Sequence, residues 1–357
     1  MTSHSILRVL DANVDRSREG LRVLEDVARF VLDDAFIASR LRDLRHRVAQ
    51  AATYLEPELL GSRRAHEDVG ASPNQPVEPL LDLEELVKAN SKRVQEALRV
   101  LEEFARLPDL SQKLDASWFK SARFDAYDME QRLIGRILRQ DKLSNLKGLY
   151  VIIDPTLTGG RPEFEVVEQA LLGGAKVIQL RDKTREKGLQ YDVALGLREL
   201  CDRHGALFIV NNDPDLALAV KADGVHLGQR DFPLDVARAI LPPDKIIGIS
   251  SATIDEARQA DVDGADYIAV GAIYPTQSKE DTRPAGLATL RQVRQLTKRP
   301  IVAIGGITLD NVEAVMAAGA DAIAVISSVV SAPDPQEAAR QLSESIRRHS
   351  EPDSGSA

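Results

Sequence analysis

The second part of the chain alternates short apolar runs with helical patterns, and this alternation constrains its fold more than any other feature. Apolar runs rich in Val, Ile and Leu begin near residue 147 and occupy residues 149–154, 177–181, 207–213, 224–228, 246–250, 267–273, 300–307 and 322–328. Stretches with helical periodicity follow them, for example residues 163–173, 253–263 and 310–318. This order is typical of buried parallel strands connected by helices.

Eight strand–helix units in about 200 residues predict a (β/α)8 barrel of the α/β class, with an open doubly wound sheet as the alternative arrangement. A short motif supports the division into units. Gly264-Ala265-Asp266 recurs as Gly319-Ala320-Asp321. In each copy we expect the glycine to end a helix just before the next strand.

The first 140 residues contain no comparable series of strands, and they carry an internal repeat. Apolar residues at three- and four-residue steps predict an all-α domain. Residues 11–30 return as residues 88–107 with about half the positions identical. The retained polar pairs are Asn13/Asn90, Arg16/Arg93, Glu19/Glu96, Arg22/Arg99, Glu25/Glu102 and Arg29/Arg106. They fit either solvated faces with ion pairs such as Glu25–Arg29, or buried and ligand-facing positions.

These patterns divide the chain into four parts. We expect the all-α domain over residues 1–140, a linker over 141–146, the barrel over 147–348 and a loose tail over 349–357. Between the two copies of the repeat, residues 61–79 are rich in Gly, Pro and Ser and predict a long loop. Because such loops are often functional, its polar residues are candidates for phosphate contact: Arg63, Arg64, His66 and Asp68.

Composition excludes several classes of protein. The longest apolar run, residues 322–332, is much shorter than the roughly 20 residues that cross a bilayer, so we expect no membrane partner. One cysteine, Cys201, rules out an intramolecular disulfide framework and, without a visible secretory signal, favours a cytoplasmic location. A net charge of −9 disfavours binding to nucleic acid but permits small phosphorylated ligands.

Polar residues at the strand ends indicate where chemistry would occur, because (β/α)8 barrels place their active sites there. Gln179, Arg181 and Lys183 alternate at the end of the second run, and Asp213 and Asp231 follow the third and fourth. Two cations near two carboxylates predict a phosphorylated ligand carried with Mg²⁺. For Asp213 alone, followed by Pro214, a helix N-cap is the simpler interpretation.

A second anion site is expected on the same rim. The Gly305-Gly306 turn follows the seventh run, and Ser327-Ser328 lie at the end of the eighth. Such barrels bind phosphate through backbone N–H groups after these two strands. Two anion sites imply two phosphorylated substrates or one bisphosphate.

Several motifs of the barrel half, taken together, resemble those of a known family. They are Gln179-Leu-Arg-Asp-Lys183, Val210-Asn-Asn-Asp213, Ala222-Asp-Gly-Val-His-Leu-Gly-Gln-Arg-Asp231, Gly271-Ala-Ile-Tyr-Pro-Thr-Gln-Ser-Lys279 and Ile304-Gly-Gly-Ile307. In this order, over about residues 147 to 345, they resemble the thiamine phosphate synthase family. The resemblance implies a (β/α)8 barrel that joins an aminopyrimidine diphosphate to a hydroxyethylthiazole phosphate and releases pyrophosphate with the help of Mg²⁺.

The resemblance also assigns residues. It implies that the pyrimidine diphosphate is held by Gln179, Arg181, Lys183, Asn212, Ser250 and Lys279. It implies that the thiazole phosphate is held by Thr276, Gln277, Ser278, Gly306, Ile326 and Ser327. Asp213 and Asp231 would bind Mg²⁺, while Arg181, Lys183 and Lys279 would stabilise the departing negative charge.

The sequence departs from the family pattern at Asp182, Ser278 and Ala252, of which the last concerns ligand closure after the fifth strand. A related barrel that only isomerises the thiazole phosphate is the alternative activity. The helical half resembles a hydroxymethylpyrimidine phosphate kinase domain fused to such synthases, although it lacks a G-x-x-x-x-G-K-[ST] loop. Its alternative role is a docking module or the contact of a homo-oligomer.

Overall fold

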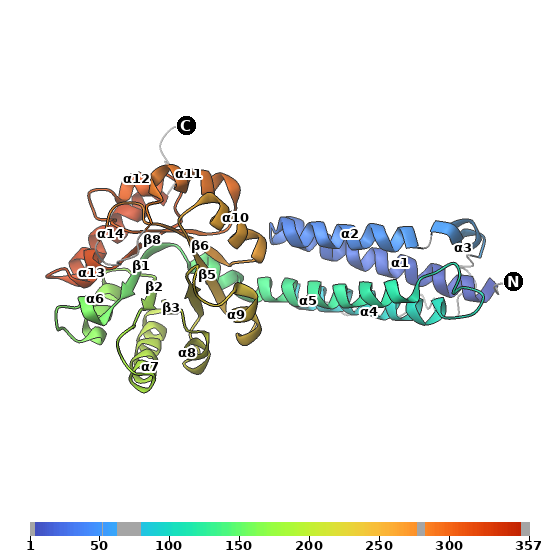
Figure 1. Ribbon diagram of the computed structural model, residues 1–357, viewed down its shortest axis with the longest axis horizontal. Helices are drawn as coiled ribbons and strands as arrows, with labels where there is room; N and C mark the ends of the chain where they lie inside the picture. Colours follow the sequence, from blue (N-terminus) through green and yellow to red (C-terminus); the bar gives the residue numbers. More distant parts are fainter. Residues whose placement is uncertain (1–3, 52, 63–79, 277–282, 351–357) are drawn as a thin grey trace. The chain divides into compact units, whose positions relative to one another are not determined.

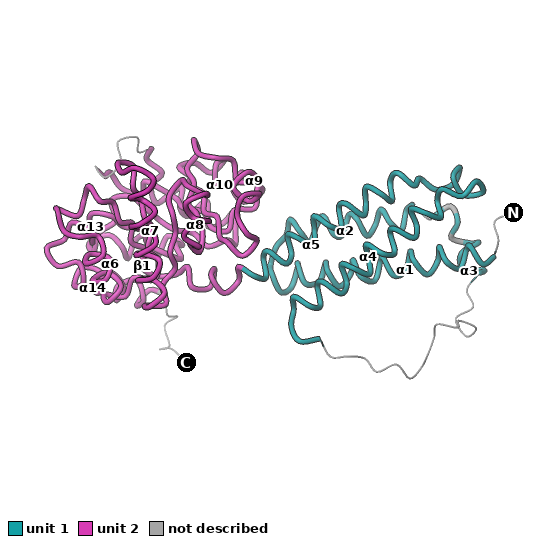
Figure 2. Tube along the Cα trace, turned by 90° about the horizontal axis from the view of Figure 1, so that it is seen from below, with its two compact units in different colours: residues 1–138 teal, residues 139–357 magenta. Residues whose placement is uncertain are grey.

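The structure, a computed structural model, describes residues 4–51, 53–62, 80–276 and 283–350. The chain forms two compact units, Met1–Leu138 and Arg139–Ala357, which are coloured separately in Figure 2. Each unit has a hydrophobic core of its own. The two units are therefore described one at a time.

The first unit is helical, as the periodicity predicts (Figure 1). Its elements are α1 (His4–Asp26), the π-helical turn η1 (Val27–Val31), α2 (Ala35–Ala51), the 3₁₀ turn η2 (Thr53–Leu55), α3 (Glu56–Ser62), α4 (Leu83–Ala105) and the first part of α5 (Ala116–Asn145). The first copy of the repeat lies in α1 and η1, and the second lies in α4 and the two residues that follow it. Gly20 of α1 lies against α4, where a Cβ atom would come within 2.7 Å of the Val94 side chain.

Two retained acids of the repeat are buried in this unit. Glu25 accepts hydrogen bonds from Arg42 at 2.9 Å and Arg45 at 3.0 Å, both on α2. Its counterpart Glu102 accepts from Arg123 of α5 at 3.0 Å. Burial alone would raise the pKa of Glu25, but the hydrogen bonds and charges of its arginines lower it. The predicted Glu25–Arg29 pair is wrong, because these buried tertiary bonds occupy the carboxylate.

The second unit is a closed parallel barrel in the order β1 to β8, with β1 paired to β8, so the open-sheet alternative is excluded. The strands are β1 (Gly148–Ile153), β2 (Val177–Leu180), β3 (Leu207–Asn211), β4 (Gly224–Leu227), β5 (Ile246–Ser251), β6 (Tyr267–Gly271), β7 (Ile301–Ile304) and β8 (Ala322–Val325). The last is shorter than predicted, since Ser327 begins a helical turn instead of extending the strand.

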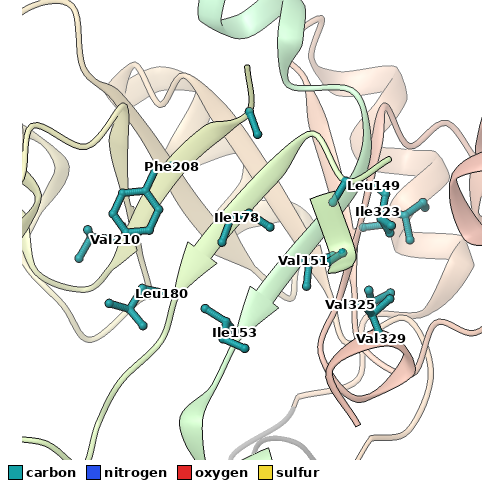
Figure 3. Close-up of a cluster of buried hydrophobic side chains, with 14 of the residues drawn as sticks. Leu149, Val151, Ile153, Ile178, Leu180, Phe208, Val210, Ile323, Val325 and Val329 are labelled. Atoms are coloured by element: carbon teal, nitrogen blue, oxygen red, sulfur yellow. The ribbon is translucent and has the colours of Figure 1, made fainter. Parts of the chain in front are cut away.

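Helices surround the strands. They are the 3₁₀ turn η4 (Pro155–Leu157), α6 (Glu163–Leu172), α7 (Lys187–His204), α8 (Pro214–Ala219), α9 (Leu234–Ile240), α10 (Ile254–Asp263), α11 (Gly286–Leu296), α12 (Val312–Ala317), α13 (Ser327–Val330) and α14 (Pro335–Ser350). Strand side chains such as Val151, Ile178 and Phe208 belong to the apolar cluster between strands and helices (Figure 3). This layer accounts for the continuous apolar runs in the sequence.

The other side chains of the same strands fill the barrel interior. Tyr150 and Ile152 of β1 and Tyr267 of β6 form a separate buried cluster there. Leu143 and Leu146, at the end of α5 and just after it, belong to the same cluster. The segment expected as a linker is therefore helical to Asn145, because its apolar side chains are buried with the barrel interior. The expected tail also starts later, since α14 continues to Ser350.

Three aspartates connect neighbouring strands where the strands begin. Each directly precedes an even-numbered strand, accepts a backbone N–H from the start of the preceding odd-numbered strand, and pairs with an arginine of the helix before that strand. The sets are Asp223 with Phe208 N–H and Arg198, Asp266 with Ile247 N–H and Arg238, and Asp321 with Ile301 N–H and Arg294. Arg139 of α5 also donates to Asp266, at 2.7 Å.

Two further findings concern the composition arguments. Within the described ranges, no helix has both the length and the apolar character needed to cross a membrane. Cys201 is a free thiol buried in the outer core of the barrel. Burial is also the main reason why its pKa is raised to about 12, so the thiol stays protonated and unreactive.

We predict that Asp266→Asn strongly destabilises the barrel. The carboxylate is fully buried, and its loss leaves the charges of Arg139 and Arg238 without their acid, which typically costs about 3 to 5 kcal/mol. Burial alone would raise the pKa of Asp266, but the two arginines and the Ile247 N–H outweigh it and lower the pKa to about 2. The carboxylate therefore stabilises the fold above about pH 4 and loses this effect as the pH falls towards 2.

Urea unfolding at several pH values would measure this effect. The matched control is Asp255→Asn, because Asp255 is a solvent-exposed acid whose partner Arg258 lies on the same helix. We expect little change in the control. Equal stability of the two variants at pH 7 would contradict the structural role given to Asp266.

Candidate active site

The carboxyl ends of the barrel strands surround a cavity of about 850 Å³. Its lining comes from every strand of the barrel, with Ile152 from β1, Gln179 from β2 and Asn211 from β3 among the contributing side chains. Polar and cationic side chains alternate with apolar ones around it. Its position agrees with the rim that the sequence predicts for chemistry.

The three alternating residues after the second run all line this cavity. Gln179 is buried, and its amide donates to the Tyr150 hydroxyl at 2.6 Å. Arg181 forms an ion pair with Asp154, which directly follows β1. Lys183 is exposed at the rim. The β2 side of the cavity therefore has one arginine held by an acid and one exposed lysine.

The two predicted metal ligands follow the adjacent strands β3 and β4. Asp213 is the N-cap of α8, where its Oδ1 accepts the Leu216 N–H at 3.5 Å and its Oδ2 pairs with Lys187. The capping role expected from Pro214 is thus present. Asp231 lines the cavity and its Oδ2 accepts the Gly228 N–H at 2.6 Å. Asp213 is not among the residues that line the cavity in the described part of the chain.

The donor set fits Mg²⁺ only together with a ligand. Within the described residues, no group of three or more His, Cys, Asp or Glu side chains could hold a metal ion. Mg²⁺ commonly binds one or two carboxylates and completes its shell with substrate phosphates and water. Asp231 places one such carboxylate at the cavity, whereas Asp213 stays a predicted ligand, because it does not line the cavity and its Oδ2 pairs with Lys187.

The predicted phosphate turn also lines the cavity. Gly305 and Gly306 both have positive φ, at 100° and 64°, and a Cβ atom at Gly306 would lie 2.6 Å from the Pro275 carbonyl oxygen. Ile326 and Ser327 line the same side, where Ser327 begins α13. The turn therefore needs glycine for both its conformation and its space.

The remaining predicted residues separate into described and undescribed ones. Asn212, with a φ of 63°, Ser250 and Thr276 line the cavity. Gln277, Ser278 and Lys279 lie outside the described residues, as do Arg63, Arg64, His66 and Asp68.

Two departures from the family pattern have clear structural positions. Ala252 is buried beside the cavity, and its N–H donates to Glu256 at 2.7 Å. Glu256 in turn binds Arg283, another residue that lines the cavity. This acid and arginine thus supply polar contacts next to the apolar Ala252. Asp182 caps the turn after β2 by accepting the Thr184 N–H at 3.0 Å.

The polar residues of the site that the sequence analysis did not assign include Tyr150, Asp154, His226 and Tyr267. The three rings line the cavity, and Asp154 holds Arg181. Tyr150 is two residues before Ile152 on the same strand face, so strand alternation was a usable signal for it. Only the register of the closed barrel shows that the three rings meet.

In the helical unit the repeat residues divide into two groups. Asn13 and Asn90 are buried, and each side-chain amide donates to a carbonyl one turn earlier in its own helix, at 2.7 and 2.8 Å. Arg16 and Arg93 are exposed. The retained asparagines are thus explained by packing, while the retained arginines face solvent.

Comparison with known proteins places this geometry in a family. The family model described as "Thiamine monophosphate synthase" matches residues 149–329. The thiamine-phosphate synthase of Thermosynechococcus vestitus is 40% identical over 340 residues, which cover 94% of this chain and 93% of that protein. The one of Gloeobacter violaceus is 42% identical over 347 residues, with coverages of 96% and 97%. The chain belongs to the thiamine-phosphate synthase family.

Solved structures agree with this thiamine-phosphate synthase assignment for the barrel. The thiamine phosphate pyrophosphorylase of Pyrococcus furiosus is 43% identical, with a TM-score of 0.54, and covers 57% of this chain and 97% of that one. The helical unit matches a separate family model, the ThiD2 family, over residues 8–132. The thiazole-isomerising alternative is not favoured, because relatives similar over nearly the full chain are named synthases.

We predict that Gly306→Ala weakens binding of small phosphate monoesters to the barrel about tenfold or more, equivalent to about 1.4 kcal/mol. The added Cβ would collide with the Pro275 carbonyl and displace the turn. The control is Gly264→Ala, a glycine that also has positive φ but has open space around it. Calorimetric titration would show equal affinities for the two variants if the turn does not bind phosphate.

Proposed function

We propose that the barrel joins an aminopyrimidine diphosphate to a thiazole phosphate and releases pyrophosphate, which makes it a transferase of alkyl or aryl groups. The observation that carries the proposal is the shared cavity. Arg181 and Lys183 lie on its β2 side, and the Gly305-Gly306 turn lies on its β7 side. One cavity can therefore bring two phosphorylated molecules together.

The chemistry requires no nucleophilic side chain. The bond between the pyrimidine methylene carbon and the diphosphate oxygen breaks, and its electron pair leaves with pyrophosphate. The lone pair of the thiazole nitrogen then forms the new carbon–nitrogen bond. Because charge separates before the new bond is complete, the protein accelerates the reaction by holding both partners in place and stabilising the departing negative charge.

Arg181 and Lys183 supply positive charge for the departing diphosphate, and we assign Lys279 the same role. Arg181 is held by Asp154, so its guanidinium is oriented before the substrate binds. Asp213 and Asp231 would hold Mg²⁺, which would supply further positive charge to the phosphates. Gln179, Asn212 and Ser250 would complete the pyrimidine subsite.

The thiazole phosphate would bind on the other side of the cavity. The Gly306 turn and the start of α13, with Ser327, line the same side of the cavity, and backbone N–H groups at a helix start are suited to an anion. Thr276, Gln277, Ser278 and Ile326 would complete this subsite. The thiazole nitrogen then faces the methylene carbon that loses pyrophosphate.

We predict that Asp213→Asn lowers kcat of thiamine phosphate formation at least 100-fold while the fold is retained. Asparagine can still cap α8, so the change removes the charge that Mg²⁺ needs and not the helix start. Asp215→Asn, two residues later and exposed, is the matched control. An Asp213→Asn enzyme with normal kcat at saturating Mg²⁺ would exclude the metal role.

For the helical unit we propose phosphorylation of the pyrimidine monophosphate to the diphosphate that the barrel consumes. The match to the ThiD2 family over residues 8–132 supports this second activity. The exposed, retained Arg16 and Arg93 are the best phosphate contacts among the described residues, because Asn13 and Asn90 are used within their helices.

We predict that the full chain forms pyrimidine diphosphate from the monophosphate and ATP, and that Arg93→Ala lowers this rate at least tenfold. Phosphorus NMR would follow the product directly. Arg347→Ala, an exposed arginine on α14, is the control. Absence of ATP-dependent product in the wild-type chain would favour the docking or oligomer role for this unit instead.

A further inference from the structure

Five polar side chains form a continuous hydrogen-bond chain across the floor of the cavity. Gln179 Nε2 donates to the Tyr150 hydroxyl at 2.6 Å, and the Tyr150 and Tyr267 hydroxyls are 3.2 Å apart. His226 Nδ1 lies 3.0 Å from the Tyr267 hydroxyl, and its Nε2 lies 2.8 Å from Ser250 Oγ. The hydrogen-bond chain thus begins and ends at residues assigned to the pyrimidine subsite.

The middle of the chain is shielded from water. Tyr150 is 1% exposed and Tyr267 is fully buried. Burial is the main cause that raises the pKa of both tyrosines, so each phenol keeps its proton. The His226 ring stacks on Tyr267 with ring centres 5.6 Å apart. Gly248 makes room for this arrangement, because a Cβ atom there would lie 1.9 Å from the Tyr267 ring.

The donors and acceptors of the chain must all point in one direction. A phenol carries one proton, and an amide N–H already donates to Tyr150, so the Tyr150 proton goes to Tyr267. The Tyr267 proton then goes to His226 Nδ1. A neutral His226 consequently carries its proton on Nε2 and donates it to Ser250. The Ser250 hydroxyl proton is then available for a hydrogen bond to a ligand in the cavity.

The opposite direction is consistent only if every member reverses together. It would require the Gln179 amide to turn so that its Oε1 accepts from Tyr150. Ser250 would then donate to His226 and present only lone pairs to the cavity. Because no buried member can reverse alone without losing a hydrogen bond, the chain couples the orientations of Gln179 and Ser250.

We propose that this chain sets the hydrogen-bonding polarity of the pyrimidine subsite, with Tyr150, Tyr267 and His226 as positioning residues. In the direction that starts from the Gln179 N–H, Gln179 presents its carbonyl oxygen to the cavity, and Ser250 presents a hydroxyl proton. The subsite therefore binds a pyrimidine whose exocyclic group can donate a hydrogen bond to the Gln179 carbonyl oxygen, such as an amino group. It rejects the 4-oxo analogue, which presents an acceptor there. This inference rests on the function proposed above.

The first test needs no catalysis. Nitrogen NMR of the full chain with ¹⁵N-labelled histidine distinguishes the two neutral tautomers from the imidazolium. The His226 signals are identified by their loss in His226→Gln. We expect a neutral ring protonated on Nε2 at pH 7. A ring protonated on Nδ1, or a charged ring, would overturn the proposed direction.

The second test is kinetic. Tyr150→Phe removes the hydroxyl that holds the Gln179 amide, so the amide can turn. We expect KM for the aminopyrimidine diphosphate to rise about tenfold, a cost of about 1.4 kcal/mol, while KM for the thiazole phosphate is unchanged. Discrimination against the 4-oxo analogue should fall by a similar factor. Tyr191→Phe, which removes an exposed hydroxyl from α7, is the control.

The outcomes separate this inference from the proposed function. If wild-type protein forms thiamine phosphate but Tyr150→Phe still discriminates against the 4-oxo analogue, the hydrogen-bond chain does not set the hydrogen-bonding polarity of the pyrimidine subsite. The same conclusion follows if both KM values rise equally, because a general loss of structure would do that. If wild-type protein forms no thiamine phosphate, the proposed function fails, and the tautomer of His226 still tests the direction of the chain.

Discussion

Every strand of the barrel is buried on both faces, and the organisation of this unit follows from that constraint. In β1, Leu149 and Val151 pack outward against the helices, while Tyr150 and Ile152 fill the interior. The two sets alternate because successive strand residues point to opposite sides. One short strand thereby supports the outer core and also supplies the floor of the cavity.

The two ends of the barrel have different roles. Where the strands begin, Asp223, Asp266 and Asp321 join backbone N–H groups of neighbouring strands to arginines of the surrounding helices. Where the strands end, Arg181 and Lys183 face a cavity. A buried carboxylate is costly unless it is fully bonded, and the fully buried Asp266 binds two arginines and a backbone N–H. Polar groups at the end of the barrel where the strands end are available to bind ligands.

The helical unit shows how a repeat can preserve polar residues for structural reasons. Glu25 and Glu102 occupy matching positions, and both are buried. Two arginines of α2 bind Glu25, whereas Glu102 is bound by Arg123 of α5 and by Arg99 of its own helix. The sequence identified both as retained but suggested a local pair for Glu25, because helical spacing reveals only neighbours on the same helix. Arginines 17 and 20 residues further along the chain were the actual partners.

The sequence by itself determined the order of strands and helices, the all-α half and the rim that carries Gln179, Arg181 and Lys183. Periodicity and turn residues are local, so they are readable without a structure. Only the tertiary structure decided that the sheet closes, that α5 continues past the expected boundary, and that Tyr150, His226 and Tyr267 meet. These three lie on β1, β4 and β6, and their contact depends on strand register and barrel closure, which no local pattern encodes.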